Sequence, residues 1–266
     1  MMPAFDNGSV WLVGAGPGDP GLLTLYAAHA LELADVVLHD ALVAPEILKM
    51  ARQARLEAVG KRAGGRATSQ LRINQRLIEL ARAGHRVVRL KGGDPLVFGR
   101  GAEEALALAA AGISFRIVPG ISAGIGGTAA AGIPTTHRGL AQSVAFATGH
   151  DANGDIPDID WEALARGADV LVLYMALSRI DAIALRMLAA GRADSEPVAF
   201  ITGATTPRQR VRVTTLADAA RVATTIERGA PTLIVIGPVV ALREIVSGWQ
   251  QTAPMTVAPP ARRATA

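Results

Sequence analysis

The chain has 266 residues, a formal net charge of +4 and no cysteine. Its length allows one large domain or two smaller ones, each with a sizeable hydrophobic core. The absence of cysteine from the sequence excludes disulfides, thiolate metal sites and a cysteine nucleophile. No apolar run approaches the ~20 residues that a membrane span needs. The first residues lack the basic and apolar segments of a signal peptide, so we expect a cytoplasmic protein.

Residues 10–25, VWLVGAGPGDPGLLTL, have the pattern of a buried strand, a glycine-rich loop and the start of a helix. In open α/β sheets such a loop, at the carboxyl end of a strand, faces the ligand. A dinucleotide fingerprint would need glycine at Asp19 and a backbone N–H at Pro17, so it is broken here. Asp40 follows the next apolar run, where a ribose-binding acid would stand. A nicotinamide oxidoreductase and a glycine-rich turn without a ligand remain alternatives.

The first half of the chain alternates short apolar runs with helical patterns, which predicts an α/β domain. Strands are predicted at 36–38, 56–59, 86–90 and 115–118, and helices at 25–33, 45–52, 70–83 and 103–111. Thr24 and Ser69 are the expected N-caps of two of these helices. The loop 60–69 carries Lys61, but Arg62 stands where a phosphate-binding loop needs Ser or Thr.

A second glycine-aspartate-proline loop, KGGDPLVFGRGAEE at residues 91–104, follows the predicted strand 86–90. It occupies the same place in its βα unit as the first loop does. We therefore expect the two loops to form two walls of one pocket. A helix of small residues after position 119 leaves room for a ligand or for close helix packing.

The second half repeats the α/β alternation without glycine-rich loops. We expect an N-terminal domain over residues 9–135, a C-terminal domain over 139–248 and a disordered tail over 252–266. Strands are predicted at 144–148, 170–174, 198–201 and 233–236, and helices at 161–165, 180–190, 216–228 and 239–247. The stretch 202–213, rich in Gly, Thr and Pro, is expected to be a loop.

Other classes of function have less support from the sequence than a ligand pocket between the two glycine-rich loops. The histidines are scattered along the sequence, so we expect no metal site. The sequence also lacks the G-x-S-x-G motif that would indicate a hydrolase. The many arginines fit an anionic partner, which keeps a nucleic-acid-binding module as an alternative. Aromatic residues make up only 4% of the chain, which argues against a stacking platform for single strands.

Six motifs, in order and at compatible spacing, resemble those of the uroporphyrinogen-III C-methyltransferases of the tetrapyrrole methylase family. They are VGAGPGDPGLLT at 13–24, VGKRAG at 59–64, LKGGDPLVFGRGAEE at 90–104, VPGISA at 118–123, GIPTTHRGLAQSV at 132–144 and TGH at 148–150. The resemblance implies the tetrapyrrole methylase fold, with two α/β domains, the active-site cleft between them, and a homodimer. The related siroheme synthases carry an extra module before this region. Nothing of that length precedes Val10, so we expect the monofunctional form.

The resemblance implies S-adenosylmethionine as methyl donor. The family's contacts with the donor map onto positions in both halves of the chain, namely Pro17, Gly92, Gly93, Asp94, Val97, Ser122, Ala123, Met175, Ala204 and Thr232. Two of these positions depart from the family's usual residues. The family commonly has threonine at Ser122 and often glycine at Ala204.

The implied substrate is uroporphyrinogen III, methylated at carbons 2 and 7 to give precorrin-2. By the resemblance, Asp40 is the proton acceptor and Lys61 the proton donor. Arg100, Glu103 and Arg138 match positions linked to substrate handling or catalysis, and the substrate's eight carboxylates would give such arginines a task. A methyltransferase acting on a later precorrin would share the donor site and remains an alternative.

Overall fold

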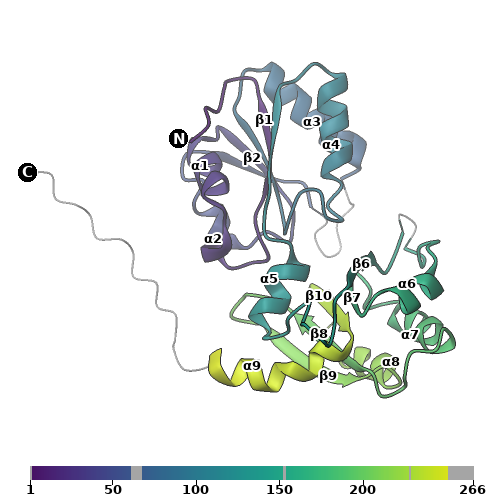
Figure 1. The fold of residues 1–266 in the computed structure, drawn as a ribbon. Helices are drawn as coiled ribbons and strands as arrows, with labels where there is room; N and C mark the ends of the chain where they lie inside the picture. Colours follow the sequence, from purple (N-terminus) through teal and green to yellow (C-terminus); the bar gives the residue numbers. More distant parts are fainter. Residues whose placement is uncertain (1, 61–67, 152–153, 228, 251–266) are drawn as a thin grey trace, which may run out of the picture.

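The computed structural model describes residues 2–60, 68–151, 154–227 and 229–250, which form two five-stranded sheets. The N-terminal sheet, in the order β3-β2-β4-β1-β5, is parallel throughout, whereas the C-terminal sheet, β6-β7-β10-β8-β9, is mixed. Figure 1 shows the two halves one above the other, with helix α5 (Ala123–Ala130) between them. Within these ranges, no helix combines the length and apolar character that a membrane crossing requires.

The N-terminal sheet consists of β1 (Val10–Gly14), β2 (Val36–His39), β3 (Arg55–Ala58), β4 (Val87–Lys91) and β5 (Phe115–Val118). Successive residues of β1 enter two different cores. Trp11 and Val13 pack with α1 (Leu25–Leu33) and α2 (Pro45–Leu48), on one face of the sheet. Val10 and Leu12 pack with α3 (Gln70–Arg82) and α4 (Gly101–Ala110), on the other. The two-residue period of a strand explains this division, and burial on both faces explains why the strands are apolar runs.

The two predicted helix caps are confirmed. The Thr24 hydroxyl accepts a hydrogen bond from Ala27 N at 3.1 Å, and the Ser69 hydroxyl accepts one from Arg72 N at 3.3 Å. In the first loop, Asp19 caps a short 3₁₀ helix, η1 (Pro20–Leu22), by accepting from Gly21 N at 2.7 Å. The residue that breaks the dinucleotide fingerprint therefore stabilises a turn.

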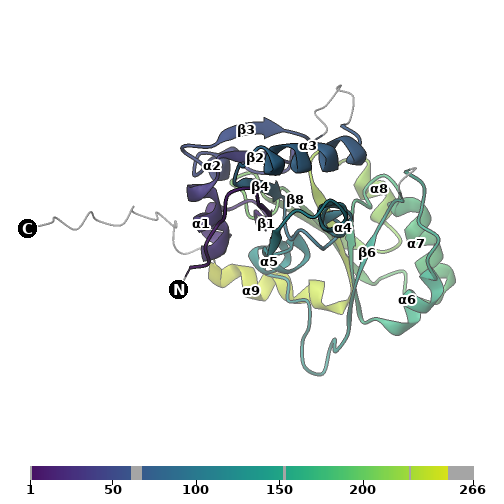
Figure 2. The ribbon, with the colours of Figure 1, turned by 90° about the horizontal axis from the view of Figure 1, so that it is seen from above.

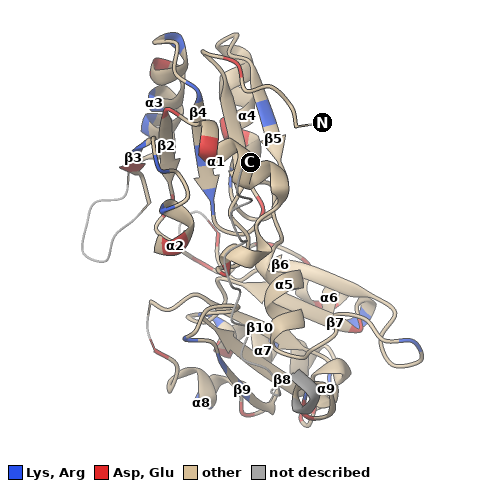
Figure 3. Cartoon of the chain, turned by 90° about the vertical axis from the view of Figure 1, so that its left-hand side faces the viewer, with Lys and Arg blue, Asp and Glu red and all other residues tan. Residues whose placement is uncertain are grey.

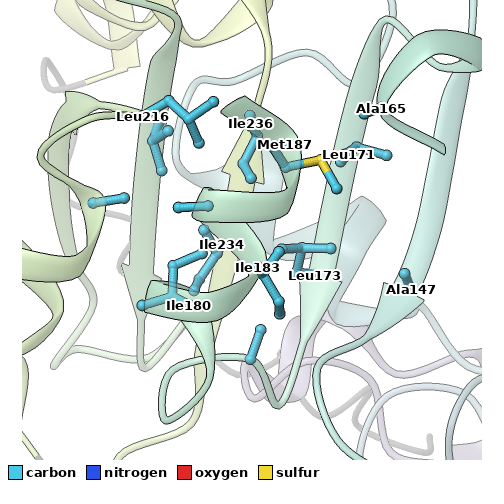
Figure 4. Packing of buried hydrophobic residues seen from close by; sticks show 14 of the residues in the cluster. Ala147, Ala165, Leu171, Leu173, Ile180, Ile183, Met187, Leu216, Ile234 and Ile236 are labelled. Atoms are coloured by element: carbon cyan, nitrogen blue, oxygen red, sulfur yellow. The ribbon is translucent and has the colours of Figure 1, made fainter. Parts of the chain in front are cut away.

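The C-terminal sheet consists of β6 (Val144–Thr148), β7 (Val170–Tyr174), β8 (Pro197–Thr202), β9 (Arg210–Thr215) and β10 (Thr232–Ile236). One of its faces is covered by α6 (Trp161–Gly167), α7 (Ile180–Ala189) and α8 (Ala219–Ala223). Figure 4 shows this apolar core, in which Ile183 and Met187 of α7 lie over the side chains of β7 and β10. The chain then forms the 3₁₀ helix η2 (Pro238–Leu242) and α9 (Arg243–Gln250).

The prediction of a loop over residues 202–213 is wrong at its end. Strand β9 begins at Arg210 and pairs antiparallel with β8, with Arg212 opposite Phe200. The alternating Arg-Val-Arg-Val sequence is typical of an edge strand, because its arginines face solvent and discourage pairing with another chain. The predicted helix 216–228 is correspondingly shorter, since within its described part, 216–227, only 219–223 is helical.

Helix α5 packs on the C-terminal sheet, although it lies within the predicted N-terminal domain. A Cβ placed on Gly127 would lie 2.8 Å from the Cβ of Ala204 and 3.2 Å from the Cδ1 of Leu233. Ala131, just after the helix, belongs to the core of the same sheet. The small residues of this helix therefore allow close packing.

Acidic and basic residues are interspersed along both halves of the molecule (Figure 3). A domain that binds nucleic acid through its backbone gathers lysine and arginine on one face or along one helix. Among the residues that the structure describes, those coloured in Figure 3 include both signs of charge in each half.

Candidate functional site

The loops that follow β1 and β4 lie side by side at the carboxyl edge of the N-terminal sheet. These two strands are neighbours, yet α1 leaves to one face of the sheet and α4 to the other. Such a switch point opens the crevice in which open α/β sheets bind ligands. The loops are joined through their backbones, because Gly16 N donates to Gly93 O at 3.1 Å and Gly93 N donates to Gly16 O at 2.8 Å. The two predicted walls thus come together.

A third loop, after β5, closes against the other two. A Cβ on Gly14 would lie 2.5 Å from Gly120 Cα and 2.6 Å from Gly93 O, so these backbones approach too closely for any side chain. The side chain of Asp94 also joins two of these loops. Its Oδ2 accepts from Gly120 N at 3.0 Å, and its Oδ1 accepts from Leu96 N at 2.8 Å. The structure thus gives Asp94 a role in holding the loops after β4 and β5 together.

Backbone strain is concentrated in the same region. In the described part of the chain, the non-glycine residues with positive φ are Phe98 (50°), Arg100 (59°), Met175 (54°) and Thr205 (62°). The first two lie in the loop after β4, and the other two in C-terminal loops that adjoin it or the first loop. Such conformations cost ~1–3 kcal/mol each and cluster at functional sites.

Tyr174, the last residue of β7, ties the C-terminal half to these loops. Its hydroxyl lies 2.6 Å from the Ser122 hydroxyl and accepts from Gly124 N at 2.7 Å. The ring of Phe98 packs against it, with the centroids 5.0 Å apart. Burial raises the pKa of Tyr174, which keeps the phenol neutral and able to donate. Ser122 and Met175 are consequently held at one junction.

The first loop meets the C-terminal half at a second junction. Asp19 N donates to the Thr205 hydroxyl at 3.0 Å, and a Cβ on Gly126 would lie 3.1 Å from Pro17 Cγ. Ala204, only 8% exposed, lies beside Gly127 of α5. The methyl group at position 204 therefore fills space next to the helix.

The structure gathers most of the predicted donor-contacting residues around these junctions. The residues gathered there are Pro17, Gly93, Asp94, Ser122, Ala123, Met175 and Ala204. The other predicted positions lie around this group. Gly92 faces Leu42, since a Cβ there would lie 3.2 Å from the Cβ of Leu42. Val97 lies in the loop after β4, and the Thr232 hydroxyl lies 3.1 Å from that of Thr202, within the C-terminal sheet.

Asp40, directly after β2, leads into a hydrogen-bonded network around three buried charged residues, Arg89, Lys91 and Glu104. We call these three, together with the partly exposed Asp40 and Gln70, the buried charge cluster. Arg89 Nη2 donates to Asp40 Oδ1 at 2.6 Å, and Arg89 Nε donates to Glu104 Oε1 at 2.9 Å. Lys91 Nζ and Gln70 Nε2 also donate to Glu104 Oε1, at 3.0 and 3.1 Å. Burial lowers the pKa of Lys91, and the charge of Arg89 lowers it further, whereas Glu104 and Asp40 raise it.

Arg89 and Glu104 are absent from the site predicted from the sequence. Both are nearly inaccessible, at 2% and 0% exposure. A signal for them exists, because Arg89 and Lys91 stand two residues apart in the otherwise apolar strand VVRLK and so point to one face. Two charges on one face of a buried strand require a partner in the helix above them.

Of the other predicted catalytic residues, the structure describes Arg100, Glu103 and Arg138, and none of these belongs to the buried charge cluster. Arg100 and Glu103 form an exposed two-pronged ion pair, with N–O distances of 2.8 and 2.7 Å. Hydrogen bonds from Arg100 hold the pKa of Glu103 below its ordinary value. Arg138 is exposed and lines an open hollow with His137 and Gln142, on the segment between α5 and β6 that extends from the body (Figure 2). Lys61 lies outside the described residues.

Comparisons with known proteins agree with this architecture. Residues 9–220 match the family described as Tetrapyrrole (Corrin/Porphyrin) Methylases. A uroporphyrinogen-III C-methyltransferase from Sinorhizobium sp is 57% identical over 91% of this chain and 87% of its own length. A siroheme synthase of Pseudomonas fluorescens strain Pf0-1 is 52% identical over 92% of the chain, and the match spans about half of that longer protein, 53%.

Solved structures give the same result. The uroporphyrin-III C-methyltransferase of Thermus thermophilus, complexed with S-adenosylhomocysteine, is 41% identical, with a TM-score of 0.77 over 88% of this chain and 99% of that one. A cobalt precorrin-4 methyltransferase reaches the same TM-score at 25% identity. The fold is the α/β tetrapyrrole methylase fold, with one sheet in each half. With its family match over most of its length, the chain belongs to the tetrapyrrole methylase family.

Proposed function

We propose that the protein is an S-adenosylmethionine-dependent uroporphyrinogen-III C-methyltransferase. It transfers two methyl groups to carbons 2 and 7 of uroporphyrinogen III and forms precorrin-2. The observation that carries this proposal is the 57% identity with the Sinorhizobium enzyme over nearly the full length of both chains. A nicotinamide oxidoreductase and a nucleic-acid-binding module have no comparable support.

The residues at the carboxyl edge fit the proposed methyl donor. Gly93 has a φ of +68°, which side chains rarely adopt, and a Cβ there would lie 3.7 Å from Ala123 N, so glycine at this position keeps the space beside α5 free of a side chain. When bound, S-adenosylmethionine supplies an activated methyl group on a sulfonium. Gly92, Gly93, Val97, Ser122, Ala123 and Met175 would hold it together with Pro17, Asp94, Ala204 and Thr232. Their task is to orient the methyl group toward a pyrrole carbon and to exclude water.

Each methyl transfer to a pyrrole carbon leaves a cationic ring, which becomes neutral by losing a proton. Asp40 is the proposed acceptor, and its side chain is 27% exposed at the carboxyl edge while the cations behind it are buried. A positioned base typically contributes ~10²–10⁴-fold to the rate. Lys61 is the proposed proton donor. Arg100 and Arg138 are proposed to bind the substrate's carboxylates, and Glu103, the ion-pair partner of Arg100, is proposed to take part in substrate handling or catalysis.

A homodimer is part of the proposal. Arg138 lies on an exposed segment that extends away from the rest of its own chain (Figure 2), and the nearby Leu140 is 39% exposed. A second copy covering this segment would bury its apolar residues. Analytical ultracentrifugation at micromolar concentration tests this, and a monomer there would remove the dimer from the proposal.

The central experiment incubates the purified protein with S-adenosylmethionine and uroporphyrinogen III without oxygen. We expect a product heavier by two methylene units and two equivalents of S-adenosylhomocysteine. A protein that binds S-adenosylhomocysteine but leaves the mass of uroporphyrinogen III unchanged would instead act on a later precorrin. Thermal stabilisation by NAD but not by S-adenosylhomocysteine would overturn the whole assignment.

A further inference from the structure

The buried charge cluster is costly for a fold to contain. Arg89, Lys91 and Glu104 are at most 2% exposed, and they lie next to the apolar core formed by β1, β2, β4, α3 and α4. Removing charges from water costs several kcal/mol per ion, and apolar residues of similar volume often serve stability as well or better. Fold stability is therefore a weak reason for this cluster.

The cluster ends at one partly exposed group. From Glu104 the hydrogen bonds run through Arg89 to Asp40 Oδ1, and Asp40 alone among the ionised members reaches the surface. Strand β4 also fixes the backbone of Asp40, because Asp40 N donates to Leu90 O at 3.2 Å. Both the main chain and the carboxylate of Asp40 are thus held by consecutive residues of β4.

The hydrogen bonds also distinguish the two carboxylate oxygens. Oδ1 accepts from Arg89, whereas Oδ2 lies 4.0 Å from Lys91 Nζ, which is too far for a hydrogen bond. Oδ2 is therefore the oxygen suited to take a proton from the substrate. Glu104 in turn fixes Arg89, because its Oε1 accepts from Arg89 Nε while Arg89 Nη2 contacts Asp40.

We propose that Glu104 and Arg89 form a positioning unit that orients the Asp40 carboxylate for proton removal from the methylated ring. This inference rests on the proposed role of Asp40 as proton acceptor. Glu104 and Arg89 do not touch the substrate in this scheme. They act through Asp40, and their contribution disappears when Asp40 is absent.

The test measures methyl transfer with a radiolabelled donor in four proteins: wild type, Asp40→Ala, Arg89→Met and the double variant. We expect Asp40→Ala to lower kcat by ~100-fold or more, as loss of a general base does. Arg89→Met should lower kcat by about tenfold and leave the affinity for S-adenosylhomocysteine within about twofold, because the donor loops are not changed. The double variant should be no slower than Asp40→Ala, because Arg89 then has nothing to position.

Arg86→Met is the matched control. Arg86 pairs with Asp35 through N–O distances of 2.7 and 3.2 Å, and these two residues stand directly before β4 and β2, whereas Arg89 lies in the middle of β4 and Asp40 directly follows β2. We expect its kcat to stay within about twofold of the wild type. If Arg89→Met does not fold, Glu104→Gln, which keeps the shape and removes the charge, is measured in the same two backgrounds.

Two outcomes distinguish failure of the positioning unit from failure of the proposed role of Asp40 as proton acceptor. If Arg89→Met slows the reaction by the same factor with and without Asp40, the cluster is merely structural and the positioning unit is disproved. If Asp40→Ala itself retains the wild-type rate, the proposed role of Asp40 fails, and the positioning unit fails with it. Loss of S-adenosylhomocysteine binding in Arg89→Met would also overturn the inference.

Discussion

An aspartate stands directly before strand β2 and another directly after it, each is paired with an arginine, and the two pairs differ in burial and in their further partners. At the amino edge of the sheet, Asp35 and Arg86 are about one-third exposed, and each can be solvated without its partner. At the carboxyl edge, Arg89 is buried, and its second partner, Glu104, is inaccessible. The same two residue types thus form an ordinary surface ion pair at one edge and the end of a buried network at the other.

The glycines differ between the two edges in the same way. Gly84 and Gly112, at the amino edge, have positive φ, and no atom lies within 4 Å of the place that a Cβ would occupy, so they serve only to end helices. Gly14 and Gly120, at the carboxyl edge, lie against neighbouring backbones. The carboxyl edge is therefore the edge that combines buried charged residues with closely packed backbones. Ligands bind at this edge in open α/β sheets.

The largest effect should come from closing the space at the carboxyl edge. Gly14→Ala places a methyl group 2.5 Å from Gly120 Cα, and rigid backbone must move to accept it. We expect a loss of about 3 kcal/mol or more in the free energy of unfolding, measured with urea. Gly112→Ala, the control at the amino edge, should cost only ~1 kcal/mol because its penalty is confined to a left-handed φ. Equal losses would remove the distinction between the edges.

A smaller effect is expected from a substitution at Gly92, also at the carboxyl edge, which should weaken ligand binding rather than folding. Gly92→Val brings a branched side chain toward Leu42, whose Cβ would lie 3.2 Å from the new Cβ. We expect S-adenosylhomocysteine to bind about tenfold more weakly by calorimetry, a change of ~1.4 kcal/mol. The Gly112→Ala protein should bind it normally. An unchanged affinity in Gly92→Val would place the donor elsewhere.

Arg138 tests whether the reaction depends on residues outside the carboxyl edge. Arg138→Ala removes a charged donor for substrate carboxylates, so we expect kcat/KM for the tetrapyrrole to fall by about tenfold. Affinity for S-adenosylhomocysteine should remain within about twofold, because Arg138 lies on a separate segment. A parallel loss of both affinities would show that Arg138 supports the donor site or the fold.

The smallest effect should be that of the amino-edge pair on stability. Hydrogen bonds from the Arg86 side chain hold the pKa of Asp35 below its ordinary value. The ionised Asp35 therefore stabilises the folded protein fully at pH values above the pKa that Asp35 has in the unfolded chain. This stabilisation disappears as the pH falls through the lower pKa of Asp35 in the folded protein. Asp35→Asn should cost ~1 kcal/mol or less near neutral pH. Urea unfolding at decreasing pH should show the gap to wild type closing, and a gap that widens would contradict this account.

Much of the N-terminal half could be predicted from the sequence because its signals are local. Thr24 and Ser69 satisfy the N–H groups of their own helices, and both glycine-rich loops follow apolar runs of strand length. Strand β9 was not predictable in the same way. Its Arg-Val-Arg-Val sequence is short and polar, and it becomes a strand by pairing with β8.

The sequence by itself determined the alternation of strands and helices, the two loops at one sheet edge and, through its motifs, the resemblance to the methylase family. These features depend on neighbours within a few residues or on the residue order of a short motif. Only the tertiary structure decided that α5 packs on the C-terminal sheet, that Tyr174 reaches Ser122, and that Arg89 links Asp40 to Glu104. Those pairings join residues far apart in the chain, 52 positions in the case of Tyr174 and Ser122, and they exist only once the sheets and helices have packed.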